Sequence, residues 1–125
     1  MEQLSRLNHK DLILWQKALD LAVVVHQSCT ALPRSETYGL VSQLRRAATS
    51  IPSNIAEGHA RRSTKEFIYF LHVARGSMAE LETQLLLEQR VGYLPASEVA
   101  DLQGRIDEVA RILHAIVAVL RRRQD

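Results

Sequence analysis

Hydroxyl side chains stand close to charged residues in one block of the sequence, and they are the first candidates for chemistry. The block runs from Gln43 to Gly58 and places Thr49, Ser50 and Ser53 near two arginines. A hydroxyl nucleophile needs an adjacent general base, and no base follows at a suitable spacing. Serines beside a helix-kinking proline more often bond to carbonyls that the kink frees. The block therefore favours a structural role over catalysis.

The histidines and the single cysteine are the candidates for metal ligands. The five histidines lie on separate segments, and the Glu-x-x-His pair with which helical bundles hold two iron ions does not occur. One cysteine, Cys29, excludes a disulfide within the chain, and its apolar neighbours predict that it is buried. The sequence also has no HExxH motif, phosphate-binding glycine loop or Gly-x-Ser-x-Gly elbow. We therefore expect no enzyme, no metal, no cofactor and no small-molecule substrate.

Polar residues at helical spacing form a second constellation. Arg46, Ser50, Asn54, Glu57 and Arg61 recur at steps of four, four, three and four, so they share one helix face. They are either a solvated stripe with ion pairs worth about 0.3–0.5 kcal/mol each, or a partly buried network that fixes helix register. We favour the network for Asn54 and Glu57. The complete predicted network is Arg45, Arg46, Ser50, Asn54, Glu57, Arg75, Glu80 and Glu82.

Positive charge is concentrated in two stretches. Residues 41–75 contain six basic and two acidic side chains, and residues 109–125 contain four and one, whereas residues 76–108 contain two and seven. Most of the cations are arginines, which pair bidentately with carboxylates or phosphates. Pairing between a basic and an acidic helix and a basic surface for nucleic acid both remain open. The candidate nucleic-acid contacts are Arg34, Arg61, Arg62, Lys65, Arg121, Arg122 and Arg123.

The elements that must position these residues are helices, because apolar residues recur at steps of three and four. The first predicted helix begins at Asp11, which can cap it, and ends before Pro33. The second runs from about Glu36 to about Ala60. Its periodicity continues through Pro52, although an interior proline costs roughly 3 kcal/mol. The sequence therefore predicts a kinked second helix.

Two further helices complete the pattern. Ser63 to Glu66 reads as a capping box that begins the third helix, which should end near Gly92. A fourth helix begins at Pro95, where a first-turn proline is tolerated. Short connections between long helices predict antiparallel neighbours. We expect an all-α, up-down-up-down antiparallel four-helix bundle.

The length of 125 residues fits one domain, with an N-terminal arm at residues 1–10 and the bundle at residues 11–123. The N-terminus has no signal-peptide pattern, and the apolar stretches fall short of the roughly 20 residues that span a bilayer. We therefore expect a cytoplasmic protein without membrane contact.

The last helix predicts self-association. Apart from His114, every residue from Ile112 to Leu120 is apolar, and a helix that is apolar on every side is buried on every side. A small bundle cannot bury such a helix alone, and the first helix also carries two apolar stripes. The candidate interface residues are Ile112, Ile116, Val117 and Val119.

Three segments resemble one family. LRRAATSIPSNIAEG (44–58), DLILWQKALDL (11–21) and FLHVARGSMAELETQL (70–85) closely resemble the bacterial four helix bundle protein family. Its founding members are encoded by intervening sequences in 23S rRNA genes, and the accessory variability protein of diversity-generating retroelements looks like a more basic relative. The resemblance implies a ring-like homopentamer with no known catalytic activity that contacts RNA or a ribonucleoprotein. An RNA-associated oligomer and a protein–protein scaffold are thus the two functions to distinguish.

Overall fold

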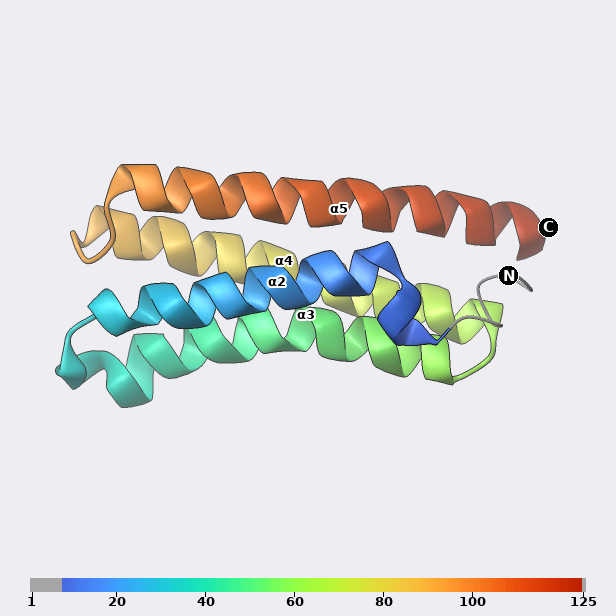
Figure 1. Ribbon diagram of the computed structural model, residues 1–125, viewed down its shortest axis with the longest axis horizontal. Helices are drawn as coiled ribbons and strands as arrows, with labels where there is room; N and C mark the ends of the chain where they lie inside the picture. The colour runs from blue at the N-terminus through green and yellow to red at the C-terminus, as the bar shows by residue number, and fades with distance from the viewer. Residues whose placement is uncertain (1–7, 125) are drawn as a thin grey trace.

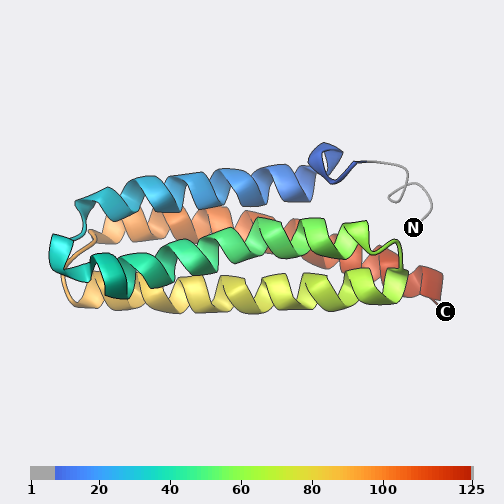
Figure 2. The ribbon, with the colours of Figure 1, turned by 90° about the horizontal axis from the view of Figure 1, so that it is seen from below.

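A computed structural model describes residues 8–124, in which long helices pack side by side as a bundle (Figure 1). α2 pairs with α3 and α5, and α4 pairs with the same two helices. Successive helices run in opposite directions, as the turned view also shows (Figure 2). The described residues contain no strand. The helices are α2 (Ile13–Ser28), α3 (Ser42–Ala60), α4 (Thr64–Arg90) and α5 (Ala96–Gln124). The predicted all-α antiparallel four-helix bundle is confirmed.

The core lies along the bundle axis and is made by the residues at three- and four-residue spacing. Leu14 and Leu21 of α2, Ile51 of α3, Leu71 of α4 and Leu113 of α5 are almost fully buried. Each such side chain contributes about 1.5–3 kcal/mol on burial. The hydrophobic periodicity therefore accounts for the way the four helices face one another.

The start of the first helix differs from the prediction. Asp11 belongs to a short 3-10 turn, His9–Asp11, in which its carboxylate accepts a hydrogen bond from the Asn8 backbone N–H. Leu12, which has no capping side chain, precedes α2. Asp11 thus closes a separate turn before the helix. Of the predicted arm at residues 1–10, residues 1–7 lie outside the described part of the chain.

The second helix begins later than predicted. A 3-10 turn, Arg34–Glu36, and one π turn, Thr37–Val41, come before α3. Thr37 and Gly39 are weak α-helix formers, so this link winds in other helical forms. α3 then continues through Pro52 to Ala60 without a break, as expected.

The remaining helix boundaries fall close to the predicted ones. Ser63 caps α4 by accepting a hydrogen bond from the Glu66 backbone N–H. Past the end of α4, Gly92 has a φ of 89°, a left-handed value that glycine adopts without strain. The Pro95 carbonyl accepts from two N–H groups in the first turn of α5. Local capping chemistry therefore positions both ends of α4.

Candidate nucleic-acid interface

Basic residues from two distant parts of the sequence lie at one end of the bundle. Arg61 and Arg62 follow the end of α3, and Lys65 lies in the first turn of α4. The last turn of α5 contributes Arg121 to Arg123. Both segments lie at the same end because neighbouring helices run in opposite directions (Figures 1 and 2). We call these six residues the basic end.

Arg34 is the predicted nucleic-acid contact that the fold separates from the others. It is exposed in the link between α2 and α3, at the opposite end of the bundle. Arg90, the last residue of α4, lies at that end too. These two exposed arginines therefore offer a control of matched charge for the basic end.

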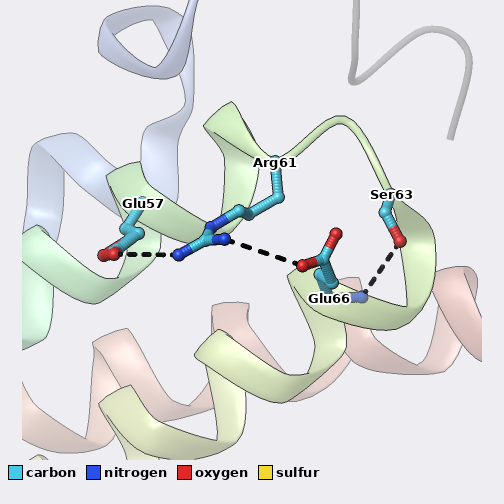
Figure 3. A network of polar contacts seen from close by, with 4 residues as sticks. All are labelled: Glu57, Arg61, Ser63 and Glu66. Carbon is cyan, nitrogen blue, oxygen red and sulfur yellow. Dashed lines mark hydrogen bonds and ion pairs between the residues drawn. The ribbon is translucent and has the colours of Figure 1, made fainter.

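Arg61 is held by its neighbours at the α3–α4 turn (Figure 3). Its guanidinium lies 3.4 Å from the Glu57 carboxylate and 3.8 Å from that of Glu66, and it stacks 5.1 Å from the centre of the Phe70 ring. All three ion-pairing side chains are about half exposed, so each pair is worth at most about 1 kcal/mol. A phosphate would have to compete with these two carboxylates for Arg61.

The turn itself is set by Arg62 and Ser63. Arg62 adopts a φ of 58°, which reverses the chain after α3, and Ser63 then caps α4. The expected capping box is half formed: the Glu66 backbone N–H donates to Ser63, while the Glu66 carboxylate faces Arg61 (Figure 3). The turn thus fixes the backbone at Arg62, while the contacts with Glu57 and Glu66 hold the side chain of Arg61.

The end of α5 is tied to α4 by an unusual contact. Nη2 of Arg121 lies 3.1 Å from Nε2 of His72. Arginine can only donate, so Nε2 accepts and this ring nitrogen carries no proton. Burial and the nearby charges of Arg75, Arg121 and His114 lower the pKa of His72. His72 is therefore neutral near pH 7. Arg122 and Arg123 are exposed beyond this contact.

Aromatic rings lie beside the basic end. Phe67 is fully buried, whereas Tyr69 is 63% exposed. The Tyr69 ring packs edge-on against Phe70 at 5.1 Å, and Arg61 covers Phe70. The core stripe of α4 passes through Phe67 and Leu71, which leaves Tyr69 on the outer side. An exposed ring among cations can stack on a base.

Two members of the predicted polar network, Ser50 and Asn54, form hydrogen bonds beside Pro52 in α3. The Ser50 and Ser77 hydroxyls lie 2.8 Å apart and link α3 to α4. The Asn54 amide donates to both the carbonyl and the hydroxyl of Ser50, at 2.8 and 2.9 Å. The carbonyl that Pro52 deprives of its helical donor is that of Ala48, so Asn54 bonds elsewhere. Ser77 is the network residue that sequence reasoning missed.

The other predicted network members do not join this cluster. Glu57 is exposed beside Arg61, so its expected burial is wrong. Glu80 receives a hydrogen bond from Gln84 on the surface of α4. Arg46 and Arg75 are exposed, Arg45 and Glu82 are half-buried. The polar face of α3 is therefore mostly a solvated stripe with ion pairs, which was the alternative to a buried network.

Glu88 is a buried acid that the sequence reasoning overlooked. Its side chain is completely buried, and neither carboxylate oxygen has a hydrogen-bond partner among the described residues. Burial raises the pKa of Glu88, and the negative charge of Glu36 raises it further. The signal was present, because Leu81, Leu85 and Glu88 continue the core spacing of α4. Cys29 is buried as predicted.

The apolar surface left open differs from the predicted interface on α5. Val117 is buried in the core, and Ile112 and Ile116 pack partly against it. Val119 is half-buried, while the outermost apolar positions are the small Ala115 and Ala118. The bundle thus covers most of α5 by itself. Val117 cannot contribute to a contact with another chain.

The open apolar surface lies instead between α2 and α3. A groove of about 610 Å³ runs beside Pro52, lined on α2 mostly by larger side chains and on α3 by small ones. Leu19 and Val23 of α2 are 39% and 49% exposed there. A second apolar patch, with Leu86, Leu87 and Val91, lies at the end of α4. The small α3 residues of the groove are Thr49, Pro52, Ser53 and Ala56.

Two kinds of site are absent from the described part of the chain. Residues 8–124 hold no group of three or more His, Cys, Asp or Glu side chains placed to bind a metal ion. None of the helices in this range combines the length and apolar character needed to cross a bilayer.

Comparison with known proteins places the chain in a family. The model of the 23S rRNA-intervening sequence protein family matches residues 10–115. A crystal structure of a protein with unknown function from the S23 ribosomal protein family of Bacteroides thetaiotaomicron superposes with a TM-score of 0.76. The two chains are 26% identical, and the alignment covers 83% of this chain and 97% of the other. Comparison with curated proteins gives no match.

The family match spans most of the chain, including the proline-containing helix α3 and the α3–α4 turn, and the structural likeness covers 83% of the chain. The chain therefore belongs to the 23S rRNA-intervening sequence protein family.

Proposed function

We propose that this protein is a self-associating, non-enzymatic helical bundle that binds the phosphate backbone of RNA through its basic end. The observation that carries the proposal is the gathering of Arg61, Arg62 and Lys65 with the last turn of α5. These segments are about 60 residues apart in sequence, and only the antiparallel fold brings them together. The family description, which refers to 23S rRNA, supports RNA as the ligand.

The chemistry of the basic end suits a sugar-phosphate backbone. Arginine donates to phosphate oxygens in a bidentate manner, and the three terminal arginines are exposed. Tyr69 supplies an exposed ring beside them. An assembly of several copies would repeat this surface, so that modest individual sites give useful avidity.

The proposal is tested with a structured, fluorescently labelled RNA and anisotropy measurements at several salt concentrations. The double variant Arg122→Ala/Arg123→Ala should bind at least tenfold more weakly, with a slope of log K against log salt that is smaller by about two. The control Arg34→Ala/Arg90→Ala removes the same charge from the other end and should bind like the wild type. No binding by the wild type at low salt would refute the RNA role.

Self-association is supported by the two open apolar surfaces. The α2–α3 groove is concave, whereas Leu86, Leu87 and Val91 lie on a different helix. Exposed apolar patches of this kind mark protein interfaces. Contact between two different surfaces is heterologous and closes into a ring when the rotation allows it. This arrangement agrees with the homopentamer that the family resemblance implies.

Light scattering measures the assembly directly. We expect a wild-type mass several times the 14.1 kDa of one chain at micromolar concentration. Leu19→Ser, in the groove, should lower the mass, whereas Tyr38→Ser, at a position 97% exposed outside the groove, should not. A wild-type mass near that of a single chain would contradict self-association.

The second candidate function is a protein–protein scaffold without nucleic acid, and the α2–α3 groove favours it. This surface has an apolar lining of the kind that accepts a partner helix. An assembly that forms in solution but does not bind RNA at any salt concentration would support the scaffold. RNA binding that depends on the basic end would exclude it as the sole role.

A further inference from the structure

Four groups that are or can become cationic lie on the neighbouring helices α4 and α5. His72 and Arg75 stand one turn apart on α4, and His114 and Arg121 stand two turns apart on α5. The contact of 3.1 Å between Arg121 and His72 joins the two helices at this point. Within residues 8–124, neither Arg75 nor Arg121 forms an ion pair with a carboxylate.

The charges around His72 have one sign. The groups that act on it are Arg75 on its own helix and Arg121 and His114 on α5, and each lowers the pKa of His72 in addition to the effect of burial. Burial and these cationic neighbours thus both favour the neutral form of His72. Arg121 consequently donates to a neutral ring, although a charged acceptor would bind its guanidinium more strongly.

Two small residues lie close in sequence to these groups. Ala118, an exposed residue between His114 and Arg121 on α5, carries only a methyl group. On α4, Gly76 follows Arg75, and a side chain built at Gly76 would meet nothing within 4 Å. Neither Ala118 nor Gly76 therefore places a bulky side chain beside Arg75 and Arg121.

We propose that His72, Arg75, His114 and Arg121 form a seat for one phosphate group, across α4 and α5 and continuous with the basic end. The guanidinium groups of Arg75 and Arg121 match the oxygens of a phosphate, and a bound anion would offset the positive charges that act on His72. A backbone phosphate of RNA and a free inorganic phosphate have the same chemistry here. The RNA version of the seat rests on the proposed function.

The test follows the imidazole signals of the protein with labelled histidine by NMR, with inorganic phosphate or a short single-stranded oligoribonucleotide as the probe. His72→Asn identifies the His72 signal. Binding of either anion should raise the pKa of His72, because the anion offsets its cationic neighbours. His26, which bonds to the Ala22 carbonyl on α2 far from the seat, serves as the internal reference.

RNA affinity supplies the second measurement. Arg75→Ala should weaken binding of the oligoribonucleotide about tenfold, which is the expected effect of losing one charge-assisted contact. Arg90→Ala removes an exposed arginine from the other end of the same helix and should leave the affinity within about twofold. Far-UV circular dichroism checks that both variants are folded.

The outcomes separate the seat from the proposed function. If the RNA binds, but Arg75→Ala behaves like Arg90→Ala and His72 does not respond, the seat is wrong and the RNA role stands. If phosphate raises the pKa of His72 while RNA does not bind, the seat is supported and the RNA role fails. If neither probe changes His72 and RNA does not bind, both are overturned.

Discussion

Gly58 should be the glycine at which alanine is least tolerated. A Cβ at this position would lie 2.6 Å from Cβ of Phe70, 3.1 Å from Cδ1 of Phe67 and 3.4 Å from the Phe67 carbonyl oxygen. Optimal carbon–carbon contacts are about 3.5–4.0 Å. Because Cβ of Phe70 moves only with its backbone, α3 and α4 would have to separate by about an ångström.

The magnitude follows from two opposing effects. Overpacking a core costs about 1–3 kcal/mol, and a clash with a main-chain-bound atom belongs at the upper end of that range. Replacing a glycine inside a helix by alanine stabilises the helix by about 1 kcal/mol. We therefore expect Gly58→Ala to lower the free energy of unfolding by about 2 kcal/mol.

Gly76 is the matched control because it also lies inside a helix, and a Cβ there would meet nothing within 4 Å. Gly76→Ala should raise the free energy of unfolding by about 1 kcal/mol. The free energies of unfolding of the two variants should therefore differ by about 3 kcal/mol. Urea unfolding followed by circular dichroism, at one protomer concentration, measures both. A Gly58→Ala protein at least as stable as the wild type would refute the close-packing argument.

Three further changes test the buried polar groups and the surface. Glu88→Gln should flatten the pH dependence of the free energy of unfolding. The pKa of Glu88 is raised by folding, so the protonated side chain stabilises the fold at pH values below its unfolded pKa, near 4.5. This contribution is lost as the pH rises through the pKa of the folded state. Equal slopes for wild type and Glu88→Gln in urea titrations from pH 4 to 8 would argue against this. Asn54→Ala should cost more than 1 kcal/mol, since it removes two hydrogen bonds beside the α3–α4 contact; a change within error would count against the network. Tyr69→Ser should change the free energy of unfolding by less than about 0.5 kcal/mol, because the ring is exposed. A larger loss would indicate that the ring is buried, contrary to the structure.

The sequence by itself determined the helices and most of the core. Steps of three and four residues mark the buried face of each helix, and this information is local, as are the cap at Ser63 and the turn at Gly92. Local signals also explain why the predicted start of the first helix was wrong. Asp11 has the right type for a cap, but Asn8 competes for the same turn.

Only the tertiary structure decided which apolar face of α5 is covered. Periodicity permits either Ile116 or Val117 on the core side, and the rotation of α5 against α4 and α2 buries Val117. The open apolar surface consequently lies on α2 and at the end of α4. No single helix carries the information that fixes this rotation, because it depends on how all four helices fill one core.

The same reason applies to the candidate sites. The α3–α4 turn, with Arg62, and the last turn of α5, with Arg121, lie at one end of the bundle because the helices alternate in direction. The α2–α3 link, which contains Arg34, lies at the other end for the same reason. The contact between His72 and Arg121 joins residues 49 positions apart. Residue types set the charge available to bind a phosphate. The packing of α4 against α5 decides where those charges converge.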